Sequence, residues 1–377
     1  MDFNGDLEEE AHFGDVVLSL AEYVADAESE IARRERAMEY LSLEDLGRFL
    51  VGNDVRTAMR ERFGTLRKCA RTNQDFFDMV VLPYTADVQA RAQQLSAAGV
   101  PSNGFVLSSP HHMSKARSTL HQIVREWSEE GRTERERCFA PILREVENRI
   151  GKGGKIAVPG CGLGRLVVEL ASRGYRAQGS EFSYQMLITG DCIMNRLLAS
   201  NQSVIYPWID QSSNVREFSE HVRGVSFPDI PCVQLLSNTP RDFLSICAGD
   251  FEEIYSRQEN KSQWDALVCC FFLDTASNIC DYLRVAKHML KPKGALISFG
   301  PLQWHFQPEH GGPSKSETDG RFFRSLELSL EEVIMTMKSF GFDIVHRERV
   351  NDCRYAGNSK SMVKTIYDCE FIVAILN

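Results

Sequence analysis

Hydrophobic residues follow two different periods along this chain. Up to about residue 150 they recur at helical spacing, and this spacing predicts helices over residues 29–50 and 76–95. The clearest stripe, at i, i+3, i+4 and i+7, consists of Leu120, Ile123, Val124 and Trp127. Strand signals are few in this part. We therefore predict a helical N-terminal region over residues 1–150 that caps the domain following it.

From Lys155 onward, short apolar runs alternate with amphipathic stretches. Strands are predicted near residues 155–158, 177–179, 243–247, 266–271, 295–299, 342–349 and 364–376. Helices are predicted near residues 165–173, 184–199, 277–290 and 330–340. Such alternation indicates an α/β, Rossmann-like fold with a parallel, doubly wound sheet over residues 151–377, and the two closing strands indicate an antiparallel edge.

Two segments are longer than an ordinary connection between elements. Residues 201–242 carry Pro207, Pro228, Pro231 and Pro240, and we predict an insertion that covers a functional face. Residues 308–321, which contain Gly311-Gly312-Pro313, suggest a mobile loop.

Three glycines at alternate positions, Gly160, Gly162 and Gly164, follow the first predicted strand, and Glu181 follows the second. This order is typical of a nucleoside site, where glycine lets the backbone turn and lets a ligand approach, and where an acid accepts the ribose hydroxyl protons. A dinucleotide site needs glycine or alanine where this chain has Arg165. The segment more closely resembles G-x-G-x-G, the S-adenosylmethionine loop of class I methyltransferases. A glycine-rich turn without a ligand is the alternative.

Further candidates follow the carboxyl ends of the other strands, where ligands bind in an open parallel sheet. Asp250 and Phe251 suit the amino group and ring of adenine, although an acid at such a place is often a helix N-cap. Asp274 is a candidate partner of the methyl acceptor, or else the N-cap of the helix predicted from Ser277. His305 follows the fifth strand, and a histidine between aromatic residues is often only packed. The run around Asp274 contains neither N-P-P-Y nor D-P-P-Y, which argues against an exocyclic base amine as acceptor.

Charge and cysteine content narrow the function classes. The net charge is -9, but residues 1–50 hold fourteen acids against four bases, so the remainder is nearly neutral and offers no basic face for nucleic acid. The eleven cysteines include no C-x-x-C pair, so we expect reduced thiols and no structural metal. The acidic N-terminus does not resemble a signal peptide, and no apolar stretch is long enough to span a membrane. We expect a cytoplasmic or nucleocytoplasmic protein.

Several motifs, in the right order, resemble the carnosine N-methyltransferases. They are Val158-Pro-Gly-Cys-Gly-Leu-Gly-Arg-Leu166, Tyr206-Pro-Trp-Ile209, Ala248-Gly-Asp-Phe251, Cys270-Phe-Phe-Leu-Asp-Thr-Ala276 and Gly300-Pro-Leu302 followed by His305-Phe306. Leu120-His-Gln-Ile-Val-Arg-Glu-Trp-Ser128 and Arg135-Glu-Arg-Cys138 extend the resemblance into the helical region. It covers roughly residues 115–377, while residues 1–110 match less clearly.

The resemblance implies a seven-stranded methyltransferase sheet, S-adenosyl-L-methionine as cofactor, and methylation of an imidazole nitrogen of carnosine to give anserine. It implies a cofactor site formed by Gln122, Arg125, Gly160, Gly162, Gly164, Glu181, Asp250, Phe251 and Cys270. It implies an acceptor pocket formed by Asp274, His305, Tyr355 and Tyr367, with Asp274 and His305 as the catalytic pair. A protein or peptide histidine methyltransferase and a non-catalytic scaffold are the alternatives, and a homodimer is a possible assembly.

Overall fold

The computed structural model describes residues 3–42, 44, 55–99, 106–307 and 324–377. The chain forms two compact units, each built from several segments. The helical unit consists of the described parts of Met1–Glu130, Tyr184–Pro231 and Ala356–Lys364. The sheet unit consists of the described parts of Gly131–Ser183, Cys232–Tyr355 and Thr365–Asn377.

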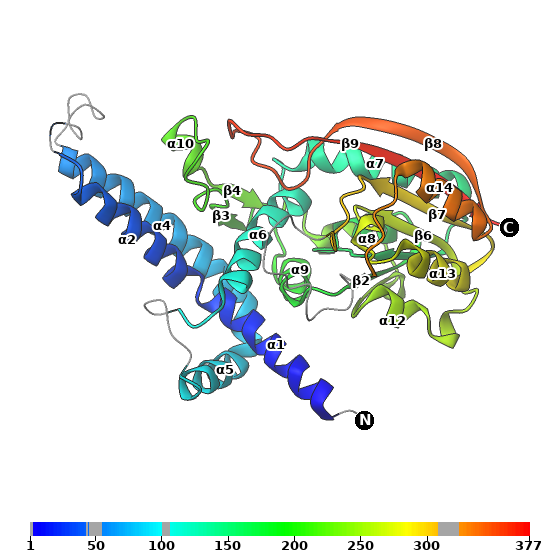
Figure 1. Ribbon diagram of the computed structural model, residues 1–377, viewed down its shortest axis with the longest axis horizontal. Coiled ribbons are helices and arrows are strands. Elements are labelled where there is room, and N and C mark those ends of the chain that lie inside the picture. The colour runs from blue at the N-terminus through cyan, green and yellow to red at the C-terminus, as the bar shows by residue number, and fades with distance from the viewer. Residues whose placement is uncertain (1–2, 43, 45–54, 100–105, 308–323) are drawn as a thin grey trace. The chain divides into compact units, whose positions relative to one another are not determined.

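A seven-stranded sheet forms the centre of the sheet unit, in the order β5-β2-β1-β6-β7-β9-β8 (Figure 1). Its strands are β1 (Lys155–Pro159), β2 (Arg176–Glu181), β5 (Leu244–Ala248), β6 (Trp264–Cys270), β7 (Leu290–Gly300), β8 (Phe342–Cys353) and β9 (Tyr367–Leu376). The first five strands in this order pair in parallel, and β9 runs antiparallel to both β7 and β8. The predicted parallel sheet with an antiparallel edge is thus confirmed.

Helices cover both faces of this sheet because successive side chains of each strand point to opposite sides. Ile156 and Val158 of β1 join a cluster with α7 (Arg132–Arg149) and α8 (Arg165–Ser172). Ala157 joins the cluster of the other face, with α12 (Phe251–Tyr255), α13 (Ile279–Met289) and α14 (Leu330–Ser339). Short elements complete the unit, namely α11 (Cys232–Leu235), η2 (Arg241–Phe243), η3 (Gln258–Asn260) and η4 (Leu273–Thr275). The strand ends are thereby fixed between two packed layers.

The boundary predicted at residue 150 falls after α7, whereas the structure divides the chain at Glu130. The physical reason lies in the apolar face of α7. Cys138, Ile142 and Val146 are buried there together with the strand residues. Helical periodicity identifies such a face but does not say which layer it packs against.

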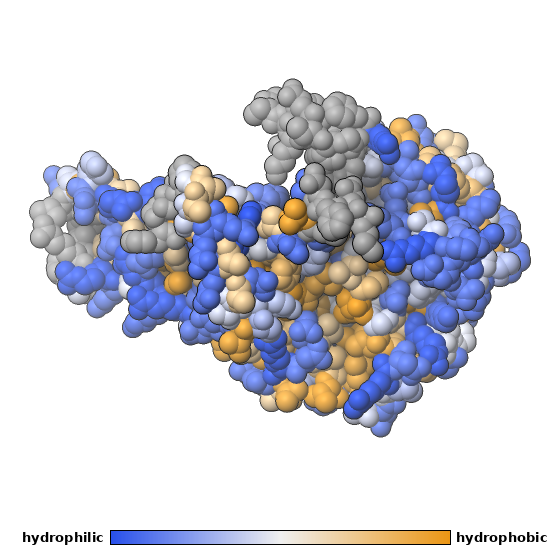
Figure 2. Space-filling view, turned by 90° about the horizontal axis from the view of Figure 1, so that it is seen from below, coloured by the Kyte–Doolittle hydropathy of each residue, from blue (hydrophilic) through white to orange (hydrophobic). Residues whose placement is uncertain are grey.

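The helical unit contains α1 (Phe3–Ala21), α2 (Tyr23–Glu39), α4 (Val55–Val81), η1 (Leu82–Tyr84), α5 (Thr85–Ala97), α6 (Pro110–Trp127), α9 (Tyr184–Arg196) and α10 (Phe218–His221). Helices α2 and α4 run side by side (Figure 1), with Ile31, Phe63 and Leu66 buried in one cluster. Their visible outer face is mostly hydrophilic (Figure 2). None of the described helices is both long and apolar enough to cross a membrane.

The helices predicted in this region are correct in kind but not in extent. The stripe of α6 is buried as predicted, with each of its four residues at most 5% exposed. Helix α2 begins before the predicted residue 29, and Leu46 lies outside the described residues. The single helix predicted over residues 76–95 is wrong, because Pro83 interrupts it between α4 and α5.

The insertion predicted over residues 201–242 is shared between the units. Its first part forms a small antiparallel sheet of β3 (Ser203–Ile205) and β4 (Val225–Phe227) in the helical unit. Its last part, from Cys232, belongs to the sheet unit. The loop predicted over residues 308–321 lies outside the described residues. Whether the insertion covers a functional face stays a prediction.

Candidate active site

The glycine turn joins the end of β1 to the start of α8. Gly160, Gly162 and Gly164 all have left-handed backbones, with φ values of 59°, 57° and 84°. A Cβ added to Gly160 would lie 2.6 Å from Cδ2 of Phe272. The turn therefore requires glycine at this position for its backbone conformation and for its close packing.

Glu181 is the last residue of β2 and lies beside this turn, as predicted. Its Oε2 accepts a hydrogen bond from Gly162 N at 2.9 Å. Its Oε1 accepts from Phe182 N at 2.9 Å and from Ser183 N at 2.8 Å. A single carboxylate thus fastens the turn to the end of the neighbouring strand. A tight glycine turn with a fixed acid beside it fits an adenosyl group, and the contact of Glu181 with ribose stays a prediction.

Asp250 and Phe251 lie beyond β5, the strand next to β2. The Asp250 carboxylate accepts from Glu252 N at 2.7 Å and so N-caps α12, which is the structural role foreseen for it. The Phe251 ring is 4% exposed and packs edge-on against Phe272 and Tyr282. Core residues cover most of the Phe251 ring and leave little of its surface for a ligand. Stacking of this ring on adenine stays a prediction.

Cys270 ends β6 and is half-buried. The next residue, Phe271, has a left-handed backbone with φ of 54°, and its N–H donates to Phe299 O at 2.7 Å. This turn directs the chain from the strand end into η4, which carries Asp274. All eleven cysteines are free thiols, and most are buried.

Asp274 is 3% exposed and is held by the segment that follows β7. Its Oδ2 accepts from Gln303 N at 2.8 Å, and its backbone carbonyl accepts from His305 N at 3.1 Å. Burial raises the pKa of the Asp274 carboxyl above its ordinary value, while the Gln303 N–H and the nearby His305 pull this pKa down. The alternative role as N-cap of α13 is wrong, because Asn278 caps that helix by accepting from Cys280 N.

Two tyrosine rings pack against the Phe271 ring. The Tyr355 centroid is 4.8 Å from that of Phe271, and the Tyr367 centroid is 6.3 Å from it in an edge-on arrangement. The Tyr367 hydroxyl donates to Oε1 of Gln303 at 3.1 Å. The structure therefore links Asp274 to Tyr367 through Gln303, with His305 two residues further on and Tyr355 against Phe271, at the carboxyl ends of β6 and β7 and the start of β9.

Gln303 is the residue of this cluster that the sequence analysis missed. It contacts Asp274 through its backbone and Tyr367 through its side chain. No periodicity or motif distinguishes an exposed glutamine after a strand. Its position two residues before His305 was the only available signal.

Gln122 and Arg125 belong to α6 in the helical unit, whereas the other predicted site residues belong to the sheet unit. Gln122 is half-buried, and Arg125 is 6% exposed, with its Nη1 3.9 Å from Oε1 of Glu126. A buried arginine needs compensating partners, because burial of an unpaired charge is costly. The part of both residues in cofactor binding stays a prediction.

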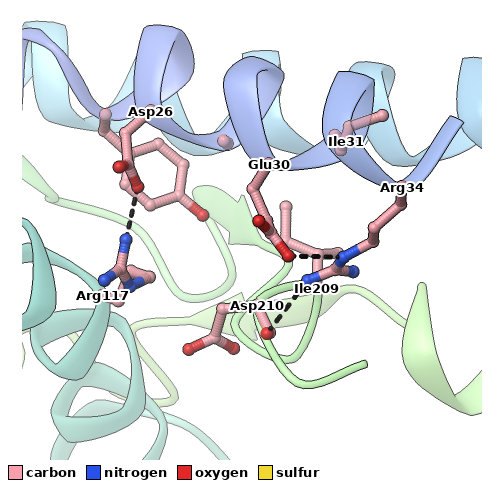
Figure 3. A pocket seen from close by; sticks show the side chains of 9 residues that line it. Asp26, Glu30, Ile31, Arg34, Arg117, Ile209 and Asp210 are labelled. Atoms are coloured by element: carbon pink, nitrogen blue, oxygen red, sulfur yellow. Dashed lines mark hydrogen bonds and ion pairs between the residues drawn. The ribbon is translucent and has the colours of Figure 1, made fainter. Parts of the chain in front are cut away.

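A cavity of about 340 Å³ in the helical unit contains none of the predicted site residues (Figure 3). Its charged side chains are largely paired: Arg117 with Asp26, and Arg34 with Glu30 at 2.8 Å. Arg34 also reaches the carbonyl of Asp210 at 3.5 Å. We interpret this network as a structural link between α2, α6 and the segment after β3. Within the described residues, no group of three His, Cys, Asp or Glu side chains could hold a metal ion.

The proteins that this chain resembles are methyltransferases. The model of a family described as carnosine N-methyltransferase matches residues 103–377. The chain is 36% identical over 316 residues to the carnosine N-methyltransferase of Mus musculus, covering 82% of this chain and 73% of the relative. It is 37% identical over 270 residues to that of Schizosaccharomyces pombe, covering 70% and 71%.

Among solved structures, magnesium protoporphyrin IX methyltransferase from Synechocystis with bound SAH is 14% identical and matches with a TM-score of 0.38. The match covers 65% of this chain and 85% of that protein.

Proposed function

Because this chain belongs to the carnosine N-methyltransferase family, we propose that it transfers a methyl group from S-adenosyl-L-methionine to an imidazole ring nitrogen of carnosine, giving anserine. The observation that best supports this acceptor is the buried Asp274 carboxylate, which lies near His305 and is linked through Gln303 to Tyr367. Asp274 and His305 follow the carboxyl ends of β6 and β7, and Tyr367 begins the antiparallel β9, in the same sheet unit as the glycine turn.

The cofactor, when bound, supplies an electrophilic methyl carbon. The glycine turn fits this ligand because three left-handed glycines form a tight turn at the end of β1, and Glu181 presents a carboxylate beside it. Holding the acceptor nitrogen in line with the methyl group is expected to supply much of the rate through proximity.

The acceptor needs orientation more than deprotonation. A free imidazole has a pKa of about 6.5, so it is largely neutral at pH 7 and one ring nitrogen carries a lone pair. Once that nitrogen is methylated the ring is a cation, and the proton on the other nitrogen must be stabilised and then removed. A carboxylate beside this second nitrogen selects the tautomer, stabilises the charge and accepts the proton.

Asp274 suits this task for two physical reasons. Burial raises the pKa of its carboxyl, which makes the carboxylate a stronger base than an exposed one. The Gln303 N–H holds one of its oxygens in place. His305 shares with Asp274 the stabilisation and removal of this proton. Tyr355 and Tyr367 orient the imidazole ring or the ends of the dipeptide.

A protein or peptide histidine methyltransferase would use the same side chains but would require an open groove. A non-catalytic scaffold is the alternative from a different class. It would tolerate loss of the glycine turn or of Glu181, and this chain retains both.

An assay with labelled S-adenosyl-L-methionine over carnosine, other imidazole compounds and histidine-containing proteins tests the proposal. We expect the highest kcat/KM with carnosine, and NMR of the product assigns the methylated nitrogen. Preferred labelling of proteins would favour the first alternative, and no labelling with intact cofactor binding would favour the scaffold.

The proposal extends to assembly and location. We propose a homodimer, which light scattering of the purified chain tests, and a location in the cytoplasm and nucleus, which imaging of a tagged chain tests. The near-neutral charge outside residues 1–50 supports a small-molecule substrate and not nucleic acid as partner.

A further inference from the structure

Gln303 contacts two residues of the predicted acceptor site. Its backbone N–H donates to Oδ2 of Asp274 at 2.8 Å, and its side-chain Oε1 accepts from the Tyr367 hydroxyl at 3.1 Å. We propose that Gln303 is a positioning residue that sets the hydrogen-bonding direction of Tyr367 and thereby the affinity for an acceptor carrying N–H groups. This inference rests on the proposed function.

The backbone of Gln303 is fixed independently of its side chain. The next residue, Trp304, is 9% exposed, and its Nε1 donates to Leu328 O at 3.2 Å. His305 N donates to the carbonyl of Asp274. The segment from Gln303 to His305 is therefore anchored at each of its three residues, so a side-chain substitution at 303 should leave the Asp274 carboxylate in place.

The side chain of Gln303 acts on the Tyr367 hydroxyl. A phenol has one proton to donate, and in this geometry Tyr367 donates it to Gln303. The phenol oxygen is then left as a hydrogen-bond acceptor. Its ring is held edge-on against Phe271, so the direction of this acceptor is fixed. Such a group favours a ligand N–H, either on an imidazole ring or on an ammonium group, over a ligand carbonyl or carboxylate.

A double-mutant cycle separates this role from a merely structural one. Gln303→Met retains length and removes the acceptor, and Tyr367→Phe removes the hydroxyl. We expect each single variant to raise KM for carnosine about five-fold, the size of one hydrogen bond, with kcat within about two-fold of the wild type. Because both act through one hydrogen bond, the double variant should also show a KM raised about five-fold.

Gln307→Met is the matched control, since Gln307 is exposed on the same segment and no hydrogen bond of its side chain is found in the described part of the chain. This variant should keep the wild-type KM. A double variant with KM raised about 25-fold, or an unchanged KM in Gln303→Met, would overturn the inference while the proposed function stands. If the wild type methylates another imidazole compound instead of carnosine, the cycle is run with that compound. If it methylates none, both proposals fail.

Discussion

Replacing Glu181 by alanine is the most direct test of the cofactor site. The Glu181 carboxylate accepts three backbone hydrogen bonds, from the N–H groups of Gly162, Phe182 and Ser183. Alanine removes all three, so Gly162 loses its hydrogen bond to the end of β2, while Cys161 N still donates to Ser180 O. The predicted ribose contact is lost as well.

The magnitude follows from the bonds involved. A hydrogen bond to a charged group contributes about 1.5–3 kcal/mol. Because Glu181 is only partly buried, we take the lower value for the bond to Gly162 and again for the ribose contact. The sum, about 3 kcal/mol, corresponds to a Kd raised about 100-fold, since 1.4 kcal/mol is tenfold.

Glutamine is not a neutral replacement at this position. Both carboxylate oxygens face backbone N–H donors, so the NH2 group of glutamine would meet one of these donors directly. We expect Glu181→Gln to weaken binding as well, which distinguishes a charge and acceptor role from simple packing.

Titration calorimetry with S-adenosyl-L-homocysteine measures the effect. Glu253→Ala removes the same charge from an exposed position in the same unit and should leave Kd unchanged. A thermal melt of each variant shows whether the fold is intact. A Kd within about three-fold of the wild type for Glu181→Ala would refute the reasoning.

Four further predictions concern the acceptor side and the turn. Asp274→Asn should lower kcat at least about 100-fold and leave the Kd of S-adenosyl-L-homocysteine unchanged, and a near-normal kcat would exclude Asp274 from the mechanism. Because burial raises the pKa of Asp274, an NMR titration of the labelled carboxyl should place it above the ordinary value of about 3.9, and a pKa at or below that value would argue against a buried base. Because the pKa of Asp274 is higher in the folded than in the unfolded state, the free energy of unfolding falls as pH rises between these two pKa values. The Asp274→Asn variant has no such titration. It should therefore melt at or above the wild-type temperature near pH 7. Gly160→Ala should cost about 1–3 kcal/mol and weaken cofactor binding, because it combines a positive φ with a Cβ close to Phe272; an unchanged melt would show that the turn relaxes freely.

Sequence reasoning succeeded where the signal is local. The alternation of strands and helices after Lys155 reflects which side chains face a core, and it predicted the sheet and its antiparallel edge. The glycines at 160, 162 and 164 report backbone angles directly, because other residues rarely adopt a positive φ. The role of Pro83 was present in the sequence as well, and the helical spacing on either side of it concealed the break.

Sequence reasoning failed, or left alternatives open, where distant segments meet. An acid after a strand caps a helix or serves a site depending on where the next helix begins. Asp250 does cap its helix, whereas Asn278 takes that place beyond Asp274. The packing partner of α7 was equally undetermined, since an apolar stripe fits any apolar layer.

By itself, then, the order of residues determined the parallel sheet, the glycine turn with Glu181 beside it, and a resemblance that named the acceptor residues. Only the tertiary structure buried Asp274, turned Gln303 toward it and aligned Tyr367 with the same glutamine. The physical reason is distance along the chain: hydrogen bonds and desolvation depend on atoms a few ångströms apart in space, and these three residues come from three separate segments.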